Sequence, residues 1–558
     1  MSAGNKSQPL PPTNTFTSHL NAGASTLDNV SDTFAGRCQY FANLIKPTFG
    51  PLGLKIMTVN RFDRIKVTGD SKTILDQIIT SGPDAKIIVD YVNMMHEECG
   101  DGCKLLIMLA SELMIELNTL ISRGLTRTEI LGTFSKIEKE MPKLFRDITC
   151  ETLPDLLDHT KMVQLIQKTV SSKVSNYSEK LSNLVYDSCL KILYPTDNKS
   201  KPVEFSPEFI RVCKIIGGSI NDSYSMPGLY LDGKPSGSVQ NRDSCKVAVF
   251  SCAFDYNRTE ATAKVYFKSS AELKAFSSDE EEHIEKIVKG FSDLGIGLII
   301  SSGKSNDLML HFANKYNIMV VNVSSKWMIR RLCVALDAQP LVSCHVPNPE
   351  ALGFVDRAQY HEVNEEDYVE FYRKDSRVHT IVIHGTTEQL LDMAENGVSS
   401  GINLLRILAR DQRLVAGGGA AEIQLGKKLR DIAQKEHNGE ISSYVYDAMA
   451  NVLERIAFTL IENSGITDPG LMIANLMSMH RSGNNNAGCA IDDDMTIRLV
   501  DNVAKHSILD ALYTKEWALR YALNSIDQMG RVNIIIMAKS SDFNPKQKKD
   551  WDTLDTDI

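Results

Sequence analysis

The chain has 558 residues, of which 43% are hydrophobic and 23% charged, so roughly two to four domains are expected, each with its own core. Its net charge of −9 is spread along the chain, which argues against a dedicated nucleic-acid binder, and no run of about eighteen uncharged apolar residues predicts a membrane span. Eleven scattered cysteines without a CxxC unit are typical of the reducing cytosol.

The first predicted region is a polar arm followed by helices. Residues 1–24 lack an apolar signal core and are interpreted as a flexible arm. Apolar positions at three- and four-residue spacing then predict a mostly helical region to about residue 150. Within it, GPLG at 50–53 follows an amphipathic run, and RIKVTGDSKTIL places Asp70 in a tight turn between a strand and a helix. Each motif alone is also compatible with an ordinary turn.

A Gly-Asp-Gly tripeptide at residues 100–102 lies between two helix-like stretches. The free N–H groups and the dipole of a helix start attract phosphate, and an aspartate there can hold the Mg²⁺ that accompanies a nucleotide. The alternative is a plain helix–helix turn, so the motif alone is a weak signal. Cys99 and Cys103 flank the turn, but a zinc site needs more ligands than His96 adds.

The middle of the chain changes character. Residues 151–218 continue helical and end in the strand-like IRVCKII and a Gly-Gly breaker. From about 219 to 369, short β-rich runs such as KVAVF, LGIGLIIS and IMVVNV alternate with helical stretches, which predicts an α/β domain. There, AELKAFSSDEEEHIEKIVKGFSDLG is interpreted as an acidic helix pair broken at Ser277-Ser278, and SSKWMIRRLC predicts a further helix.

The last part returns to helices. A strand, HTIVIHG, and a helix occupy 370–401, and 402–540 is helical with a strand-like end, VNIIIMA. Three consecutive glycines, 417–419, open a helix there and allow close backbone approach to a ligand. Residues 541–558 are short, charged and expected to be disordered. This order indicates one domain inserted into another, with the termini close together.

From about Asn29 to Asp552, the chain resembles the group II chaperonins, in particular the eukaryotic cytosolic chaperonin. The resemblance rests on a series of motifs in the same order, namely GP-x-G, T-x-D, GDG, IRVCKIIGGS, RRLC, VxGGGAxEI and KKDWD. The resemblance implies a multidomain α+β chaperonin fold with a mostly helical equatorial domain, a small split α/β hinge and an inserted α/β apical domain. The implied domains are an equatorial nucleotide-binding domain (25–150 and 402–540), an intermediate hinge domain (151–218 and 370–401) and an apical substrate-binding domain (219–369).

The resemblance also implies a site for ATP or ADP with Mg²⁺. By match to the family's motifs, Asp101 would coordinate Mg²⁺, and Asp70 is one of two acids that position the attacking water. Gly418 would lie against the ribose side, Gly488 in an adenine-side loop, and Asp510 would contact the ribose. The full nucleotide-binding set implied by the motifs is Gly50, Pro51, Gly53, Gly69, Asp101, Gly102, Cys103, Lys104, Gly418, Gly488 and Asp510.

The chain departs from the family's pattern at the second catalytic acid. Glu395 matches a glutamate that precedes an acidic pair in the family, so Ser399 and Ser400 occupy the pair and Ser400 stands at the catalytic aspartate position. A serine hydroxyl cannot accept a proton at pH 7 as a carboxylate does. Cys103 replaces a family threonine. Lys104, where the family has an uncharged polar residue, could hold ADP or replace lost Mg²⁺ coordination, but a solvated lysine is the simpler interpretation.

The resemblance implies a subunit of a hetero-oligomeric double-ring ATP-dependent chaperonin in the cytoplasm, whose partners are paralogous subunits and unfolded clients, without nucleic acid or membrane. We expect this subunit to bind nucleotide but hydrolyse it weakly, although a water relay from Asp70 is the alternative. A second alternative is an off-ring chaperonin-like scaffold without folding ATPase activity. A freestanding small-molecule ATPase or kinase would need a P-loop or a kinase signature set, and the chain has neither.

Overall fold

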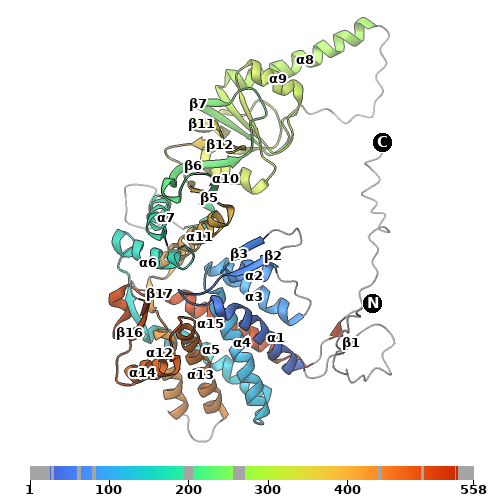
Figure 1. Ribbon diagram of the computed structural model, residues 1–558. Coiled ribbons are helices and arrows are strands. Elements are labelled where there is room, and N and C mark those ends of the chain that lie inside the picture. The colour runs from blue at the N-terminus through green and yellow to red at the C-terminus, as the bar shows by residue number, and fades with distance from the viewer. Residues whose placement is uncertain are drawn as a thin grey trace, which may run out of the picture.

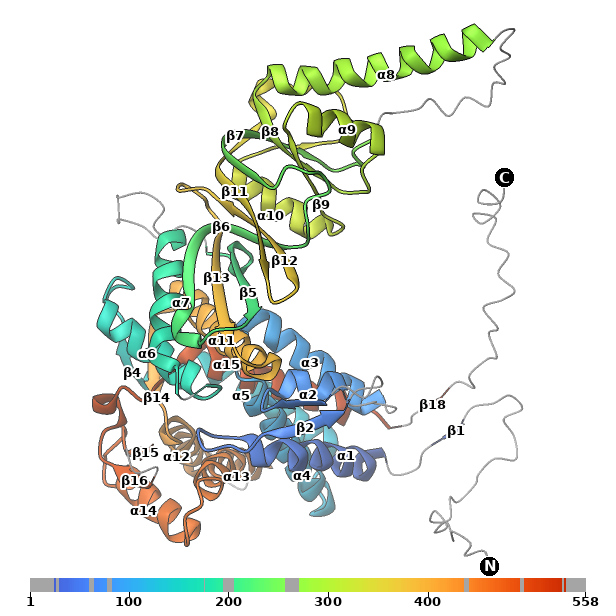
Figure 2. The ribbon, with the colours of Figure 1, turned by 45° about the horizontal axis from the view of Figure 1, so that its top comes forward.

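The described part of the molecule has a helical body at one end and a β-rich part at the other, joined by α6, α7 and α11 (Figures 1 and 2). It was obtained as a computed structural model, which describes residues 25–26, 30–59, 65–77, 83–174, 176–193, 205–255, 270–435, 441–491, 496–533 and 536–537. The predicted arm, 1–24, and the predicted tail, 541–558, lie outside the described residues.

The helical body combines the beginning and the end of the chain around one apolar core. Its central helix, α4 (Cys103–Ser122), packs against α1, α13 and α15. Among the described helices, only α4 is long and apolar enough to cross a membrane, but most of its apolar window is buried inside the body. The helices of the body are α1 (Val30–Ile45), α2 (Ser71–Gln77), α3 (Pro83–Cys99), α4, α5 (Arg127–Asp147), α12 (Ala420–Lys435), α13 (Ile441–Glu462), α14 (Pro469–Arg481) and α15 (Leu512–Gly530).

Small sheets bring distant segments of the body together. A three-stranded antiparallel sheet has the order β17-β14-β4, so that strands from three separate parts of the chain lie side by side. The other sheets have two antiparallel strands each. The strands are β1 (Ser25–Thr26) with β18 (Ile536–Met537), β2 (Ile56–Val59) with β3 (Ile65–Thr68), β15 (Gly488–Ile491) with β16 (Ile497–Val500), and β4 (Thr149–Thr152), β14 (Arg413–Ala416) and β17 (Leu509–Ala511).

The connecting region consists of three helices and the first strands of a long sheet. Helix α11 (Glu388–Arg410) packs on α6 (His159–Ser171) and α7 (Ser178–Leu193). It follows β13 (His379–Gly385), which pairs in parallel with β5 (Ile210–Ile216). The sheet continues in the order β5-β13-β6-β12-β11-β7-β8-β9, with β10 beside β7, so one ladder runs from the connecting region into the β-rich part.

Successive side chains of a strand point to opposite faces of this sheet, and helices pack on both faces. Val247 and Val249 share a core with α10, whereas Ala248 and Phe250 share one with α8 and α9. The elements are β6 (Tyr224–Asp232), β7 (Asn241–Phe250), β8 (Ile296–Ser301), β9 (Met319–Asn322), β10 (Pro340–Leu341), β11 (Gly353–Val363), β12 (Glu366–Tyr372), α8 (Ser270–Asp293), α9 (Asp307–Lys315) and α10 (Lys326–Leu336). The predicted α+β fold class is confirmed.

Two helix predictions in this part had different outcomes. The helix predicted from SSKWMIRRLC is confirmed as α10. The acidic helix pair broken at Ser277-Ser278 is wrong, because α8 is one continuous helix through both serines and extends beyond the sheet (Figure 2). Serine has a middling helix propensity, so two serines without a glycine or proline do not end a helix.

Candidate nucleotide-binding site

The GPLG turn is fastened to the helical body. It follows a short 3₁₀ helix, Lys46–Thr48, and the Gly53 N–H donates to the Gly50 carbonyl at 3.2 Å. Asn463, just after α13, donates its side-chain amide to two carbonyl oxygens of this segment at 2.5 and 2.8 Å. The backbone of the turn is therefore held in one shape before any ligand arrives.

The two carboxylate oxygens of Asp70 contact different partners. Its Oδ2 accepts the N–H and the O–H of Thr73, each at 3.0 Å, and so caps the start of α2. Its Oδ1 lies 3.4 Å from Lys173 Nζ. Burial alone would raise the pKa of Asp70, but Lys173 and the two Thr73 hydrogen bonds outweigh it and hold that pKa below its usual value. The carboxylate is thus ionised at neutral pH.

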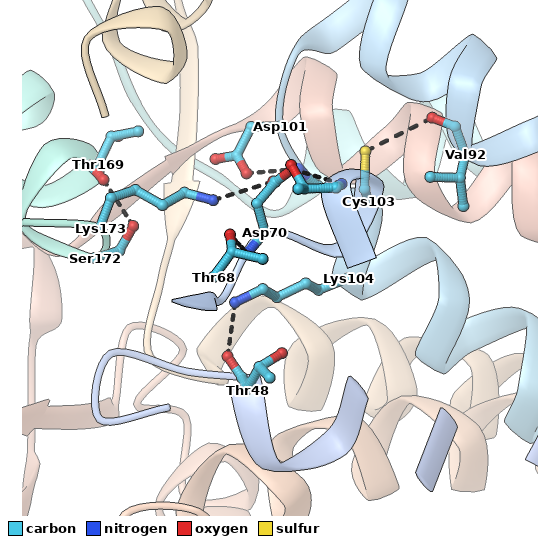
Figure 3. A network of polar contacts seen from close by, with 12 residues as sticks. Thr48, Thr68, Asp70, Val92, Asp101, Cys103, Lys104, Thr169, Ser172 and Lys173 are labelled. Carbon is cyan, nitrogen blue, oxygen red and sulfur yellow. Dashed lines mark hydrogen bonds and ion pairs between the residues drawn. The ribbon is translucent and has the colours of Figure 1, made fainter. Parts of the chain in front are cut away.

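Asp101 lies in a turn that only glycine can flank. Gly102 has a φ of +82°, and a Cβ there would lie 2.6 Å from the Met95 Cε. The exposed Asp101 carboxylate accepts the Gly102 N–H at 2.8 Å, and Figure 3 shows it beside Asp70 and Lys173. The turn therefore presents one accessible acid next to a partly buried ion pair.

This donor set fits a magnesium ion that arrives with phosphates. Mg²⁺ commonly takes one or two protein carboxylates together with phosphate oxygens and water. Asp101 supplies one exposed carboxylate, whereas the two carboxylate oxygens of the neighbouring Asp70 already contact Thr73 and Lys173. In the described residues, no group of three or more His, Cys, Asp or Glu side chains could hold a metal by itself. The protein groups thus suit a metal–nucleotide complex better than a resident ion.

The two residues after this turn point in different directions. The buried Cys103 thiol faces α3, with its Sγ 3.7 Å from the Val92 carbonyl, and burial raises its pKa far above the usual range. Lys104 instead reaches under Asp70, and its Nζ donates to the Thr48 carbonyl at 2.7 Å (Figure 3). The interpretation of Lys104 as a solvated surface lysine is wrong, because α4 is the central helix and its first turn faces the site.

Burial also changes the acid–base chemistry of Lys104. It lowers the pKa of Lys104 to about 8, and Lys173 acts in the same direction, whereas Asp101 and Asp70 act against the shift. The ammonium form therefore still predominates at pH 7. A Cβ built on Gly69 would lie 3.9 Å from this ammonium, so the β3–α2 turn also contributes to its surroundings.

The three-glycine turn forms a second half of the candidate site. Gly418 has a φ of +62°, and a Cβ there would lie 2.3 Å from the Cys489 carbonyl oxygen, so a side chain has no room. A Cβ on Gly488 would lie 3.1 Å from the Gly417 carbonyl oxygen. Asp510 pairs with Val415 in the strand that leads into the turn. Gly418, Gly488 and Asp510 are therefore brought together from three segments.

The two halves touch through the helical body. Cβ atoms built on Gly50 and Gly419 would lie 3.0 and 3.8 Å from methyl groups of the same residue, Leu460 on α13. A Cβ on Gly102 would lie 2.8 Å from the Thr514 methyl group, at the start of α15 and next to Lys515. The predicted loops thus converge on one region of the molecule although they are up to 460 residues apart.

Ser400 is a buried residue of α11, between two residues of that helix that border the site. A Cβ on Gly397 would lie 3.6 Å from the Lys173 Cβ, and a Cβ on Gly100 would lie 2.1 Å from the Asn403 amide nitrogen. Residues 397, 400 and 403 form a stripe at three-residue spacing, so Ser400 lies between these two contacts. It is only 6% exposed. Position 400 therefore lies on a stretch of α11 that borders Lys173 at one end and the Gly-Asp-Gly turn at the other.

Several residues of the site were missed by the sequence reasoning. Lys173 follows α6 in a segment without a recognisable motif, and Asn463 comes directly after a plain amphipathic helix. Glu422 lies in the glycine-rich motif itself, and Lys515 follows Asp510 by five residues, so their positions carried a signal that was not used. Lys515 Nζ lies 2.6 Å from Glu422 and 2.9 Å from Asp510.

We predict that Lys515→Met lowers the free energy of unfolding by about 3–5 kcal/mol, because removing one member of a buried ion pair leaves the other unpaired. Burial alone would lower the pKa of Lys515, but Asp510 and Glu422 outweigh it and raise that pKa. The measurement is urea unfolding of the full chain. The double change K515M/E422Q should recover part of the loss, and an unchanged unfolding curve for K515M would contradict the prediction.

Comparison with known proteins agrees with this geometry. Residues 41–540 match the TCP-1/cpn60 chaperonin family. The chain is 34% identical over 519 residues to T-complex protein 1 subunit theta of Mus musculus, which covers 92% of this chain and 93% of that protein. The subunit theta of Homo sapiens is 33% identical with the same coverage, and that of Dictyostelium discoideum is 31% identical over 91% of this chain and 93% of its own.

Proposed function

Because the chain belongs to the TCP-1/cpn60 chaperonin family, we propose that it is one subunit of a hetero-oligomeric double ring in the cytoplasm that uses ATP to assist the folding of other proteins. The observation that carries the proposal is a match to chaperonin subunits over 92% of the chain. The convergence of three glycine-containing turns and two aspartates in the helical body supports it further.

Nucleotide would bind across both halves of the candidate site. The GPLG turn and the first turn of α4 would face the phosphates, since the N–H groups at a helix start attract anions. Asp101 would hold Mg²⁺, which neutralises phosphate charge when bound. Asp510 would accept hydrogen bonds from the ribose hydroxyls, and the bare backbone at Gly418 would allow the sugar to approach closely.

Hydrolysis would be weak in this subunit because a proton acceptor is missing. Asp70 spends one carboxylate oxygen on capping α2 and turns the other toward Lys173. Ser400, on the opposite side of that pair, offers only a neutral hydroxyl. Loss of a general base typically slows a reaction by about 10²- to 10⁴-fold. The subunit would therefore hold nucleotide for longer than a subunit with an aspartate at this position.

The connecting region would transmit the state of the nucleotide site. Asp392, on α11, lies 3.1 Å from Lys66 of the β2–β3 hairpin and 2.7 Å from Lys214 of β5. Arg406, on the same helix, donates to the carbonyls at the end of α3, next to Asp101. One helix thus contacts both the nucleotide turns and the long sheet, which is the arrangement that a hinge between domains requires.

The β-rich part would bind client polypeptides. Trp327, at the start of α10, is 68% exposed and lines a groove in which two arginines outnumber one glutamate. The other lining residues are Glu208, Phe209, Arg330, Arg331 and Val334. An exposed aromatic ring with neighbouring guanidinium groups suits segments that contain both apolar and acidic side chains. This role follows from the family, in which the inserted domain binds substrate.

The β2–β3 hairpin supports membership of a ring over the off-ring scaffold. Four apolar side chains on or next to it are between 54% and 69% exposed, namely Leu54, Met57, Val59 and Ile65. A two-stranded sheet with exposed apolar side chains is only marginally stable alone, and it leaves strand edges that can pair with another chain. A neighbouring subunit would cover this surface and continue the sheet.

The native mass of the tagged chain, isolated from its own cells, tests the ring. We expect a particle many times larger than the 62.0 kDa chain, which contains paralogous subunits in addition to this one. Mass spectrometry of the intact particle and of its denatured subunits measures both properties. A monomer or a small complex would contradict the ring and favour the off-ring scaffold.

A further inference from the structure

We propose that Lys104 is a direct ligand of nucleotide phosphate and lets this subunit retain a nucleoside diphosphate after Mg²⁺ has been removed. The inference deepens the proposed function and rests on it, since it assumes that nucleotide binds between the GPLG turn and the Gly-Asp-Gly turn. It concerns one side chain, its three N–H donors and the backbone that surrounds it.

The ammonium of Lys104 lies where three loops meet. It starts from the first turn of α4, reaches the Thr48 carbonyl at the base of the GPLG turn, and passes beside Gly69. Within the described part of the chain, the Thr48 carbonyl is its one hydrogen-bond acceptor, so two of the three N–H donors are available to phosphate oxygens. A surface lysine would reach solvent instead.

Within the described residues, Lys104 forms no ion pair, although Asp101 and Asp70 are close enough to favour its charged form. Lys173 and Asp70 already form an ion pair with each other. Asp101 is exposed and is the acid that would turn toward Mg²⁺. Cys103, the preceding residue, is buried and faces the Val92 carbonyl, so it adds neither charge nor a donor to the phosphate side. An anion in this space would therefore meet a half-buried ammonium at the N-terminus of α4.

Partial burial strengthens this contact. Hydrogen bonds from an ammonium to a phosphate are charge-assisted and stronger than neutral ones, and lower exposure to water reduces their screening. Mg²⁺ normally supplies most of the neutralisation at such a site. With Lys104 in place, removal of the metal would leave one fixed cation against the phosphates, and the diphosphate would dissociate less readily.

The test uses the particle isolated through a tag on this chain. It is cross-linked to radiolabelled 8-azido-ADP in two parallel samples, one that contains Mg²⁺ and one that contains EDTA. Separation of the subunits then reports the label on this chain alone. In EDTA we expect K104T to lower the affinity of this subunit by roughly 10- to 100-fold relative to the natural chain, the range for losing a charge-assisted hydrogen bond. K104R, which keeps the positive charge, should retain most of the labelling.

Matched controls separate this role from a structural one. Lys136→Thr, at an exposed lysine on α5, should label as the natural chain does, and recovery of each variant in the particle reports its folding. Labelling of K104T in EDTA that equals or exceeds that of the natural chain would overturn the proposal. If the natural chain takes no label even with Mg²⁺ while its neighbours do, nucleotide binding by this subunit fails, and the role of Lys104 fails with it.

Discussion

An S400D variant is expected to hydrolyse its bound ATP about 10²- to 10⁴-fold faster than the natural subunit, because it restores a carboxylate beside Asp70. Position 400 lies on α11 between the contacts of Gly397 with Lys173 and of Asn403 with Gly100. The new acid would accept a proton from water held between it and the phosphate.

The rate of ATP hydrolysis can be measured for this subunit alone within the particle. Azido-ATP labelled at either the α- or the γ-phosphate is cross-linked at successive times, and loss of γ-label relative to α-label reports hydrolysis. S400N, which matches aspartate in shape but has no basic carboxylate, should remain slow. S399D, one residue along and about 100° around the helix, is the positional control. Equal rates for S400D and the natural chain would contradict the missing-base explanation.

The double change M57K/V59K is expected to prevent incorporation of the chain into a ring. Met57 and Val59 occupy alternate positions of β2 and point to the same exposed side of the hairpin. Burying two unpaired ammonium groups in a subunit contact costs far more than the roughly 1.4 kcal/mol that corresponds to a tenfold change in affinity. Recovery of the variant in the large particle should therefore fall at least about tenfold.

The fold of this variant should survive, because neither side chain belongs to a core. Size-exclusion chromatography of tagged chains measures the distribution between large and small species, and circular dichroism measures the helix content. Val342→Lys is a matched control, since Val342 is an exposed apolar residue directly after β10, which pairs with β7 in the long sheet and not with the hairpin. Normal assembly of M57K/V59K would show that the hairpin takes no part in the contact between subunits.

Local patterns predicted the turns of the candidate site because each depends on residues adjacent in the sequence. Glycines at 100, 102 and 418 have positive φ angles, and such positions are recognisable from composition alone. The alternation of short β-rich and helical runs likewise predicted an α/β domain, but not which helices cover which face of its sheet. Binding of nucleotide at these turns, and the residue limits assigned to the three domains, stay predictions.

Partners that come from elsewhere in the fold could not be predicted in the same way. Lys173 acts through Asp70, which precedes it by about a hundred residues, so nothing in its own segment marks it. Lys104 was interpreted as solvated because a lysine at a helix start usually is. Its partial burial depends on Thr48 and Gly69, which come from two turns far from it in the sequence, and this is a tertiary property. The continuity of α8 also escaped local reasoning.

The length of α11 has a mechanical consequence. Its 23 residues span about 35 Å at 1.5 Å per residue, with the Gly-Asp-Gly contact in its second half and strand β13 directly before its first residue. A rotation of about 10° around the nucleotide end would sweep the other end through roughly 6 Å, given that helical rise. If α11 rotates as a rigid body, it would act as a lever arm, and the sheet at its start would move farther than the turns of the nucleotide site.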